Sequence, residues 1–180
     1  MASLPCSDPV PVRLDLDPHF RPCEPEEGDE IYPNGIFEFN ITRLLVHIGA
    51  TGRFRVELVA LDEIPYGGKS PGLKELAVIE ADLSRPVILA EISPGRYSLI
   101  DGNHRVAKAR REGAPNIPAY RIRCPEHVAF LTTTRAYEAY VGYWNSKVDD
   151  AEADRRRRTR TRGDRGVSRH PGRGRPVPDL

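Results

Sequence analysis

The fold is decided by residues 98–109, which read SLIDGNHRVAKA. The first three residues end an apolar strand, and the pair Asp101-Gly102 favours a tight turn. Apolar residues return at Val106-Ala107, so one side of a following helix can be pinned to the sheet. We therefore expect the strand to pass directly into a helix at this turn.

The turn contains the donors of an anion site. The first turn of a helix exposes unpaired backbone N–H groups and the positive end of the helix dipole, and both favour anions. Gly102 has no Cβ, so a phosphate can approach the main chain there. Arg105 supplies a planar fork of donors for phosphate oxygens, and His104 supplies a titratable donor. The pattern predicts a phosphate-binding turn.

The same residues also fit a turn without a ligand. Asp101 and Asn103 are good helix N-cap residues, and Gly102 suits a tight turn whatever lies beside it. On spacing alone we weigh this structural alternative equally with phosphate binding. The adjacent basic residues His104 and Arg105 then favour phosphate.

Composition divides the chain into three segments. Residues 1–30 contain six prolines and eight acidic residues, which indicates an extended, mostly unordered leader. Residues 31–148 carry the apolar patterns of one compact domain, for which the length of 180 residues suffices. Residues 149–180 show no apolar periodicity and are expected to form a disordered tail. That tail carries ten arginines, against a formal charge of only +1 for the whole chain.

Nothing in the sequence indicates a membrane or a secretory route. No apolar stretch approaches the roughly eighteen residues that span a bilayer, and the N-terminus lacks the pattern of a secretion signal. Cys6, Cys23 and Cys124 are odd in number and far apart, without the spacing of metal ligands. We expect a cytoplasmic protein without structural zinc, and an inert thiol at Cys124.

The apolar patterns predict an α+β domain. A turn at 93–95 should join two of its strands into a hairpin, and a Gly- and Pro-rich loop covers 66–72. The aromatic residues of the last helix recur at helical spacing and are expected to be core. Strands are expected at 36–39, 53–61, 86–92, 96–100 and 117–122, and helices at 41–48, 73–80, 101–112, 125–131 and 133–147.

Four blocks of sequence together resemble the ParB/sulfiredoxin superfamily. They are VELVALDEI at 56–64, RPVIL at 85–89, YSLIDGNHR at 97–105 and GAPNIPAY at 113–120. The resemblance implies a small mixed sheet with flanking helices. It also implies a nucleoside di- or triphosphate, such as ATP, ADP or CTP, held with or without Mg²⁺ at the helix after the turn.

The resemblance also assigns contacts. It implies that Gly102, Asn103, His104 and Arg105 contact the phosphates. By the same resemblance, Lys69 and Ser70 are placed near the ligand on the loop after the first strand.

Departures from the family narrow the function. Sulfiredoxins carry a cysteine where this chain has Asn103, so sulfinic-acid repair is not expected. Chromosome-partitioning ParB proteins need a DNA-reading domain, for which too little chain follows Arg123. The local match is best to the free-serine kinase branch, which has Asp-Gly-His-His-Arg. Its glutamate base has no counterpart in the loop at 66–69.

These observations leave several functions open. The first is a nucleotide-binding module that uses residues 101–105. The second is a small phosphotransferase, nucleotidase or nuclease with Asp101 and His104 as catalytic residues. The third is a structural domain with a vestigial phosphate cradle.

The arginines of the tail suggest a separate contact. Arg155, Arg156, Arg157 and Arg158 begin a basic arm that can bind nucleic-acid phosphates non-specifically, as in a DNA-associated partition-type accessory protein. The alternative is a solvated tail, since no aromatic residues are interleaved to stack on bases. The sequence leaves the oligomeric state open.

Overall fold

The computed structural model describes residues 11–65 and 74–164. The chain divides into two units, with the boundary between Val148 and Asp149. No helix in the described ranges combines the length and the apolar character needed to cross a membrane.

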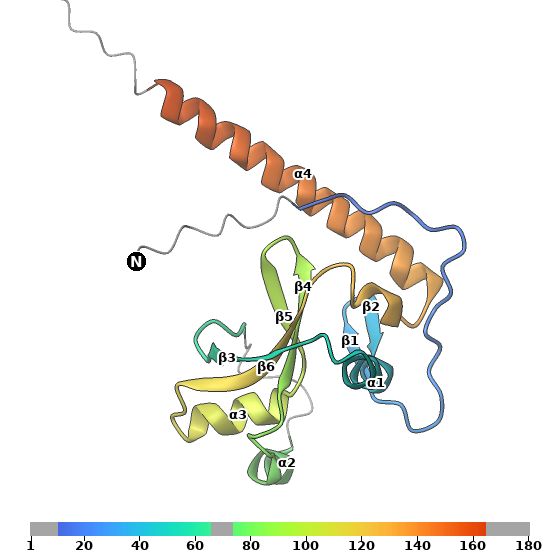
Figure 1. Ribbon diagram of the computed structural model, residues 1–180, viewed down its shortest axis with the longest axis vertical. Helices are drawn as coiled ribbons and strands as arrows, with labels where there is room; N and C mark the ends of the chain where they lie inside the picture. Colours follow the sequence, from blue (N-terminus) through green and yellow to red (C-terminus); the bar gives the residue numbers. More distant parts are fainter. Residues whose placement is uncertain (1–10, 66–73, 165–180) are drawn as a thin grey trace, which may run out of the picture. The chain divides into compact units, whose positions relative to one another are not determined.

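The first unit is an α+β domain, as the sequence predicts (Figure 1). The last helix begins in this unit and continues into the second one. The strands are β1 (Ile31–Asn34), β2 (Phe37–Asn40), β3 (Val56–Ala60), β4 (Val87–Ser93), β5 (Arg96–Asp101) and β6 (Asn116–Ile122). The helices are α1 (Ile41–Thr51), α2 (Glu75–Glu80), α3 (Asn103–Arg111), the single 3₁₀ turn η1 (Val128–Phe130) and α4 (Thr134–Asp164).

The main sheet has four strands in the order β3-β6-β4-β5. The predicted hairpin is confirmed, because β4 and β5 pair antiparallel around the turn at 94–95. The crossover through β5 and α3 then brings β6 back parallel to β4. β3 pairs antiparallel with β6 along the opposite margin, and β1 and β2 form a separate two-stranded sheet. The sheet is therefore mixed, as expected.

β4 is buried on both faces, which explains its nearly continuous apolar sequence. Successive side chains of a strand point to opposite faces of the sheet. Val87 and Leu89 belong to the hydrophobic cluster that includes Val106 and Ala109 of α3. Ile88, Ala90 and Ile92 belong to the second cluster. Residues of α1, the β1–β2 hairpin and α4 complete this cluster.

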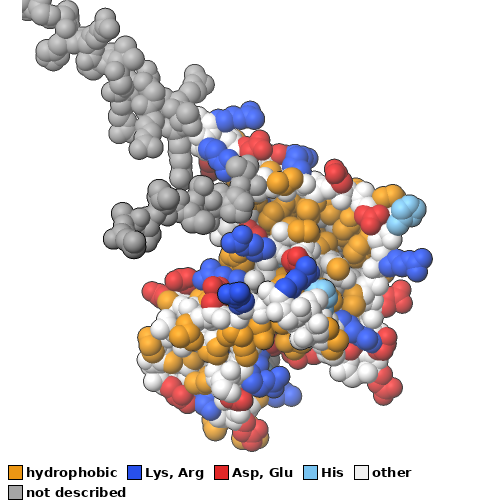
Figure 2. Space-filling view, in the orientation of Figure 1, with side chains coloured by type: hydrophobic (Ala, Val, Ile, Leu, Met, Phe, Trp, Pro, Cys, Tyr) orange, Lys and Arg blue, Asp and Glu red, His pale blue; other side chains and the backbone are white. Residues whose placement is uncertain are grey.

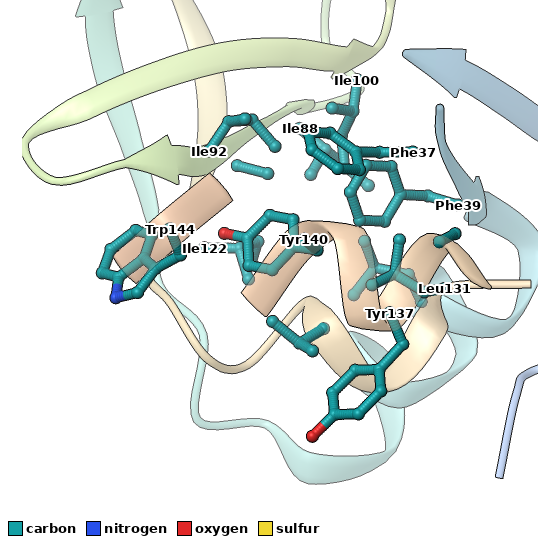
Figure 3. Packing of buried hydrophobic residues seen from close by; sticks show 14 of the residues in the cluster. Phe37, Phe39, Ile88, Ile92, Ile100, Ile122, Leu131, Tyr137, Tyr140 and Trp144 are labelled. Atoms are coloured by element: carbon teal, nitrogen blue, oxygen red, sulfur yellow. The ribbon is translucent and has the colours of Figure 1, made fainter. Parts of the chain in front are cut away.

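Tyr140 of α4 lies at the centre of the second cluster (Figure 3). Its ring is fully buried, and it meets the ring of Phe37 edge-on at a centroid distance of 5.3 Å. Tyr137 and Trp144 are also buried, so the prediction that the aromatic stripe forms core is confirmed.

Hydrogen bonds link three polar groups beside the second cluster, whereas Nδ1 of the buried His127 has no hydrogen-bond partner among the described residues. The Tyr140 hydroxyl donates to the carbonyl of Glu91 at 3.1 Å and lies 2.9 Å from Nε2 of His127, from which it accepts. Burial lowers the pKa of His127 to about 4, so this imidazole is neutral at pH 7. Burial also raises the pKa of the neighbouring Cys124 thiol to about 12, and a thiol with so little thiolate is a poor nucleophile.

Helix ends follow side-chain and glycine capping. Asn40 caps α1, because its Oδ1 accepts from the backbone N–H of Arg43 at 3.0 Å. The helix expected at 41–48 is longer than predicted: α1 ends at Thr51 and is followed by Gly52, which has the left-handed φ of +60°. Gly113 takes the same conformation after α3, and the N–H of Ala114 reaches back to the carbonyl of Ala109 at 2.9 Å.

Residues 11–30 form an extended N-terminal segment, as their composition predicts. This N-terminal segment contains no helix or strand, but it is tied to the first turns of α4. The amide of Asn145 exchanges two hydrogen bonds with the backbone of Leu14, and Nε1 of Trp144 donates to Val12 at 2.9 Å. The ring of Phe20 stacks on Tyr137 at 3.8 Å. The N-terminal segment has no regular secondary structure, and aromatic and amide groups of α4 hold it in place.

The expectation of a disordered tail from Asp149 was wrong as far as Asp164, because α4 continues to that residue. The absence of apolar periodicity shows that this part has no buried face, but it does not prevent a helix. Ala, Glu and Arg are good helix formers, and no proline interrupts them. An ion pair between Glu152 and Arg156 at 3.5 Å has the i, i+4 spacing that stabilises a helix. Residues 165–180 lie outside the described ranges.

The buried His127 predicts a pH-dependent stability. Its folded pKa of about 4 lies below the usual value of 6.5, so between these limits protons bind the unfolded chain preferentially. Stability should fall as the pH drops from 6.5 towards 4, by up to about 3 kcal/mol at about 1.4 kcal/mol per unit of pKa. Chemical denaturation at pH 7 and pH 4.5 measures this loss.

The matched comparison is His127→Gln, which keeps a donor for Tyr140 but does not titrate. Its free energy of unfolding should change less over the same interval than that of the parent chain. Equal pH slopes for the two proteins would contradict the assignment.

Candidate functional site

The structure confirms a direct passage from strand to helix at the predicted turn. β5 ends at Asp101, α3 begins at Asn103, and Gly102 is the single residue between them. Gly102 has a φ of +99°, a left-handed conformation that side chains disfavour. The carbonyl of Gly102 accepts from the N–H of Val106 at 2.9 Å and so begins the hydrogen bonding of the helix.

Gly102 is also required by crowding. A Cβ at this position would lie 2.5 Å from Cγ1 of Val87 and 2.9 Å from Nε of Arg105. This differs from the expectation that the missing Cβ makes room for a phosphate. The chain's own side chains fill that space, so a ligand has to approach the turn from another side.

Asp101 and Arg105 form an ion pair across the turn. The guanidinium donates from one terminal nitrogen to a carboxylate oxygen at 2.5 Å, and the side chains are only 12% and 11% exposed for Arg105 and Asp101. The spacing of four residues places the arginine on the helix side above the end of β5. Asp101 is therefore an engaged carboxylate rather than a free one.

Two polar atoms of the first turn are buried and have no hydrogen-bond partner among the described residues. They are Nε of Arg105 and Nε2 of His104. An unpaired buried polar group costs about 1–3 kcal/mol. A ligand that supplies the missing hydrogen-bond partner would remove this cost.

The alternative of a side-chain-capped turn is wrong. Gly102 itself is the N-cap residue of α3, and no side chain accepts from the backbone there. Asn103 is the first helical residue and Asp101 binds Arg105, so neither performs the capping role. The first N–H groups of α3 thus gain no side-chain acceptor from the described part of the chain.

A second loop approaches the turn. Ser84 donates from its hydroxyl to a carboxylate oxygen of Asp82 at 2.7 Å and from its backbone N–H at 2.9 Å. These bonds lower the pKa of Asp82, and the charges of Arg85 and Arg105 lower it further. Sequence reasoning missed this loop, because only the fold brings residues 82–85 near Arg105.

The other basic residues of α3 are structural anchors. Lys108 donates to the carbonyls of Ile79 and Ala81, at the C-terminal end of α2. Arg110 donates to the carbonyls of Leu61 and Ile64 at 2.8 and 3.1 Å. Basic residues after the first turn therefore hold α2 and the chain after β3. Within α3, the buried polar atoms without hydrogen-bond partners lie in the first turn.

The structure brings together only part of the predicted site. Asp101 and Arg105 are in contact. His104 precedes Arg105, so its side chain points about 100° away round the helix axis, and no hydrogen bond joins it to either residue. Lys69 and Ser70 lie outside the described residues.

The predicted basic arm, which begins at Arg155, is far along the chain from the turn between β5 and α3. Arg155, Arg156 and Arg157 are exposed on α4 in the second unit, and the side chain of Arg158 is outside the described part. Within the described ranges, no group of three His, Cys, Asp or Glu side chains is placed to hold a metal ion.

Comparison with protein-family models, with curated proteins and with solved structures finds no match for this chain. The likeness to the ParB/sulfiredoxin superfamily accordingly rests on the sequence blocks quoted above. The candidate site is assigned from its own geometry.

The crowding at Gly102 predicts the effect of a single methyl group. Gly102→Ala should destabilise the protein by about 2 kcal/mol or more, because a left-handed backbone and a clash with Val87 add. Gly113→Ala is the matched control, since Gly113 is also left-handed but has open space where a Cβ would lie.

Denaturant unfolding of both variants measures the difference. We expect Gly113→Ala to cost about 1 kcal/mol, the penalty of a left-handed backbone alone. In the Gly102→Ala background, Val87→Ala should relieve the clash, so its added cost should be smaller than in the parent chain. Equal losses for the two glycine variants would show that crowding does not restrict the turn.

Proposed function

We propose that the turn between β5 and α3 binds a phosphate group of a nucleotide. The observation that carries the proposal is the pair of buried, unpartnered polar atoms on Arg105 and His104. Both belong to the first turn of a helix, where the dipole and the backbone N–H groups favour an anion.

The ion pair with Asp101 determines how a phosphate would reach Arg105. A guanidinium has five N–H donors, and the contact with Asp101 uses one terminal nitrogen. A phosphate can therefore bind the remaining donors or displace the carboxylate. In either case the negative charge of Asp101 opposes the incoming anion, so the carboxylate should weaken binding while it holds the arginine in place.

The nucleotide part of the proposal depends on the resemblance to the superfamily, whose members hold nucleoside di- or triphosphates. ATP, ADP and CTP are the first ligands to test, with and without Mg²⁺. Binding without turnover is preferred, because Asp101 is engaged by Arg105 and is not available as a free base. A cytoplasmic setting, expected from the scattered cysteines, belongs to the same proposal.

Removing the guanidinium tests the site. Arg105→Ala should weaken nucleotide affinity by about 1.5–3 kcal/mol, the range for a hydrogen bond to a charged group, which is roughly 10- to 150-fold in the dissociation constant. Isothermal titration calorimetry with ATP, ADP, CTP, GTP and inorganic phosphate measures it. Arg135→Ala removes the same charge from an exposed position on α4 and should leave affinity unchanged.

Asp101→Asn gives the complementary result. It removes the competing negative charge and should raise affinity, provided that the variant remains folded by circular dichroism. Product analysis in the same samples tests the alternative of a phosphotransferase, nucleotidase or nuclease with Asp101 and His104 as catalytic residues. Equal affinities for the parent chain and Arg105→Ala would refute the site, and nucleotide turnover that both Asp101→Asn and His104→Ala abolish would favour the enzyme.

A second candidate function is the binding of nucleic acid by the second unit. Arg155, Arg156 and Arg157 are consecutive exposed residues of a helix, so their side chains spread around its axis. This arrangement suits phosphate contacts without base readout.

Deletion of residues 152–180 tests the arm. The parent chain should shift a DNA or RNA duplex with an affinity that falls steeply with salt, and the deletion should lower both the affinity and the salt slope. A nucleic-acid shift assay at two salt concentrations is sufficient. An unchanged slope in the truncated protein would exclude the arm as the contact.

A further inference from the structure

Residues 11–23 of the N-terminal segment are bound to α4 mainly through their main chain (Figure 1). The side-chain amide of Asn145 donates to the carbonyl of Leu14 at 2.9 Å and accepts from the N–H of the same residue at 2.8 Å. The indole N–H of Trp144 donates to the carbonyl of Val12 at 2.9 Å. An amide that bonds both backbone groups of one residue acts as a neighbouring strand does. These contacts therefore recognise an extended peptide through groups that do not depend on its side chains.

A third side chain of α4 makes the same kind of contact. The hydroxyl of Tyr137 accepts from the N–H of Asp17 at 2.8 Å. Tyr137, Trp144 and Asn145 are seven and eight positions apart, so they lie on one face of the helix. We call these three side chains the α4 face. It supplies hydrogen-bond partners to a stretch of chain that has no secondary structure of its own.

Few side chains of the segment contribute to the contact. Leu14 and Phe20 pack against the second cluster, whereas residues 15–19 between them are exposed. Val12 is 76% exposed and Leu16 is 59% exposed. Figure 2 shows hydrophobic side chains gathered at the surface over the first half of α4, the part that the segment contacts. The segment thus has two apolar anchors six positions apart, and its other side chains are little constrained.

The chain that follows the segment is held at a separate point. Asp29 accepts from Nδ2 of Asn40 at 2.7 Å and from Nε of Arg43 at 3.5 Å. Residues 24–28 lie between this point and the part bound to α4, and they are exposed. A segment with few buried apolar contacts opens locally at a lower free energy than the whole domain. The segment can therefore leave α4 while its tether at Asp29 stays in place.

We propose that the α4 face is a binding surface for an extended peptide of another protein, and that residues 12–20 occupy it as an intramolecular competitor. The contacts define the chemistry of this peptide: an extended main chain with an aliphatic and an aromatic side chain six positions apart. Recognition of the main chain lets the face accept segments other than its own.

The tether argues against a second copy as the partner. A short flexible tether gives the bound segment an effective concentration of about millimolar. A second copy brings the same segment without this advantage, so it competes poorly, whereas a peptide with better anchors can displace the segment. The proposed phosphate site is on α3, so neither function requires the other.

Binding of a synthetic peptide to the full chain tests the α4 face. The probe is a fluorescent peptide of residues 11–22, and its anisotropy measures the dissociation constant. Leu14→Pro in the full chain removes an apolar anchor and the N–H that donates to Asn145, so the tethered segment competes less. This variant should bind the probe about tenfold more tightly than the parent chain, the scale of one hydrogen bond.

Leu16→Pro is the matched control. Leu16 is exposed, and its N–H donates to no group in the described part of the chain, so this variant should bind the probe as the parent chain does. The probe offers the same comparison. Its N-methylation at Leu14 should weaken binding to the Leu14→Pro chain by about tenfold, and N-methylation at Leu16 should leave binding unchanged.

The fluorescence of Trp144 reports on the α4 face directly, because it is the only tryptophan of the chain. Acrylamide should quench it more in Leu14→Pro than in the parent chain, and the probe should restore its protection. Asn145→Ala in the Leu14→Pro background should abolish probe binding, which would place the probe on the α4 face.

Other outcomes would overturn the proposal. A folded Leu14→Pro chain that binds the probe no more tightly than the parent would show that the α4 face accepts no segment from outside. Equal binding of the two N-methylated probes would show that the main chain is not recognised. Dimers of the parent chain that Asn145→Ala abolishes would make a second copy the partner instead. If Leu14→Pro does not fold, Phe20→Ala gives the same test, and loss of the fold in both would make the segment part of the core.

Discussion

The structure depends on a strand that is buried on both faces. β4 supplies Val87 to the cluster against α3 and Ile88 to the cluster against α4, so both layers are built on it. The same strand controls the candidate site, because Val87 lies where a side chain on Gly102 would be. The turn is thus held by core packing and not by a side-chain cap. Such support keeps the first turn of α3 in one position while its polar atoms remain unpaired.

In the candidate site, Asp101 competes with a phosphate for Arg105. Asp101 occupies a donor of Arg105, and this contact neutralises the positive charge that a phosphate would use. The ion pair also restrains the guanidinium at the helix start, which reduces the entropy that a ligand would have to remove. The net effect of the carboxylate on a bound anion is the difference between repulsion and preorganisation. Under the proposed function, anion selectivity at this turn would depend on one acidic residue as much as on the basic ones.

Local signals in the sequence were sufficient to predict most of the helices and strands. Asn40 caps α1 through its own side chain, and Gly113 ends the hydrogen bonding of α3 with a left-handed residue. These features depend on residues within four positions of each other. At the site, the contact between Asp101 and Arg105 also has a local signal, the spacing of four residues, but the same arginine equally fits phosphate binding.

Other features could not be predicted because their partners are distant in sequence. The amide of Asn145 reaches Leu14, and Asp82 approaches Arg105 only when the sheet has formed. The crowding at Gly102 likewise depends on Val87, fifteen positions away on a neighbouring strand. Composition correctly indicated that residues 11–30 form no helix or strand, but it could not show that α4 offers them partners. For the start of the second unit, helix propensity was more informative than apolar periodicity.

The attachment of the N-terminal segment to α4 has a consequence for folding during synthesis. Val12 and Leu14 leave the ribosome early, but Trp144 and Asn145, to which they bind, are made more than 120 residues later. The sheet and α3 can assemble in the meantime, whereas the aromatic core stays open to water until α4 arrives. Contacts so far apart along a chain form slowly. The apolar surface that α4 covers therefore stays exposed on the nascent chain until α4 is made.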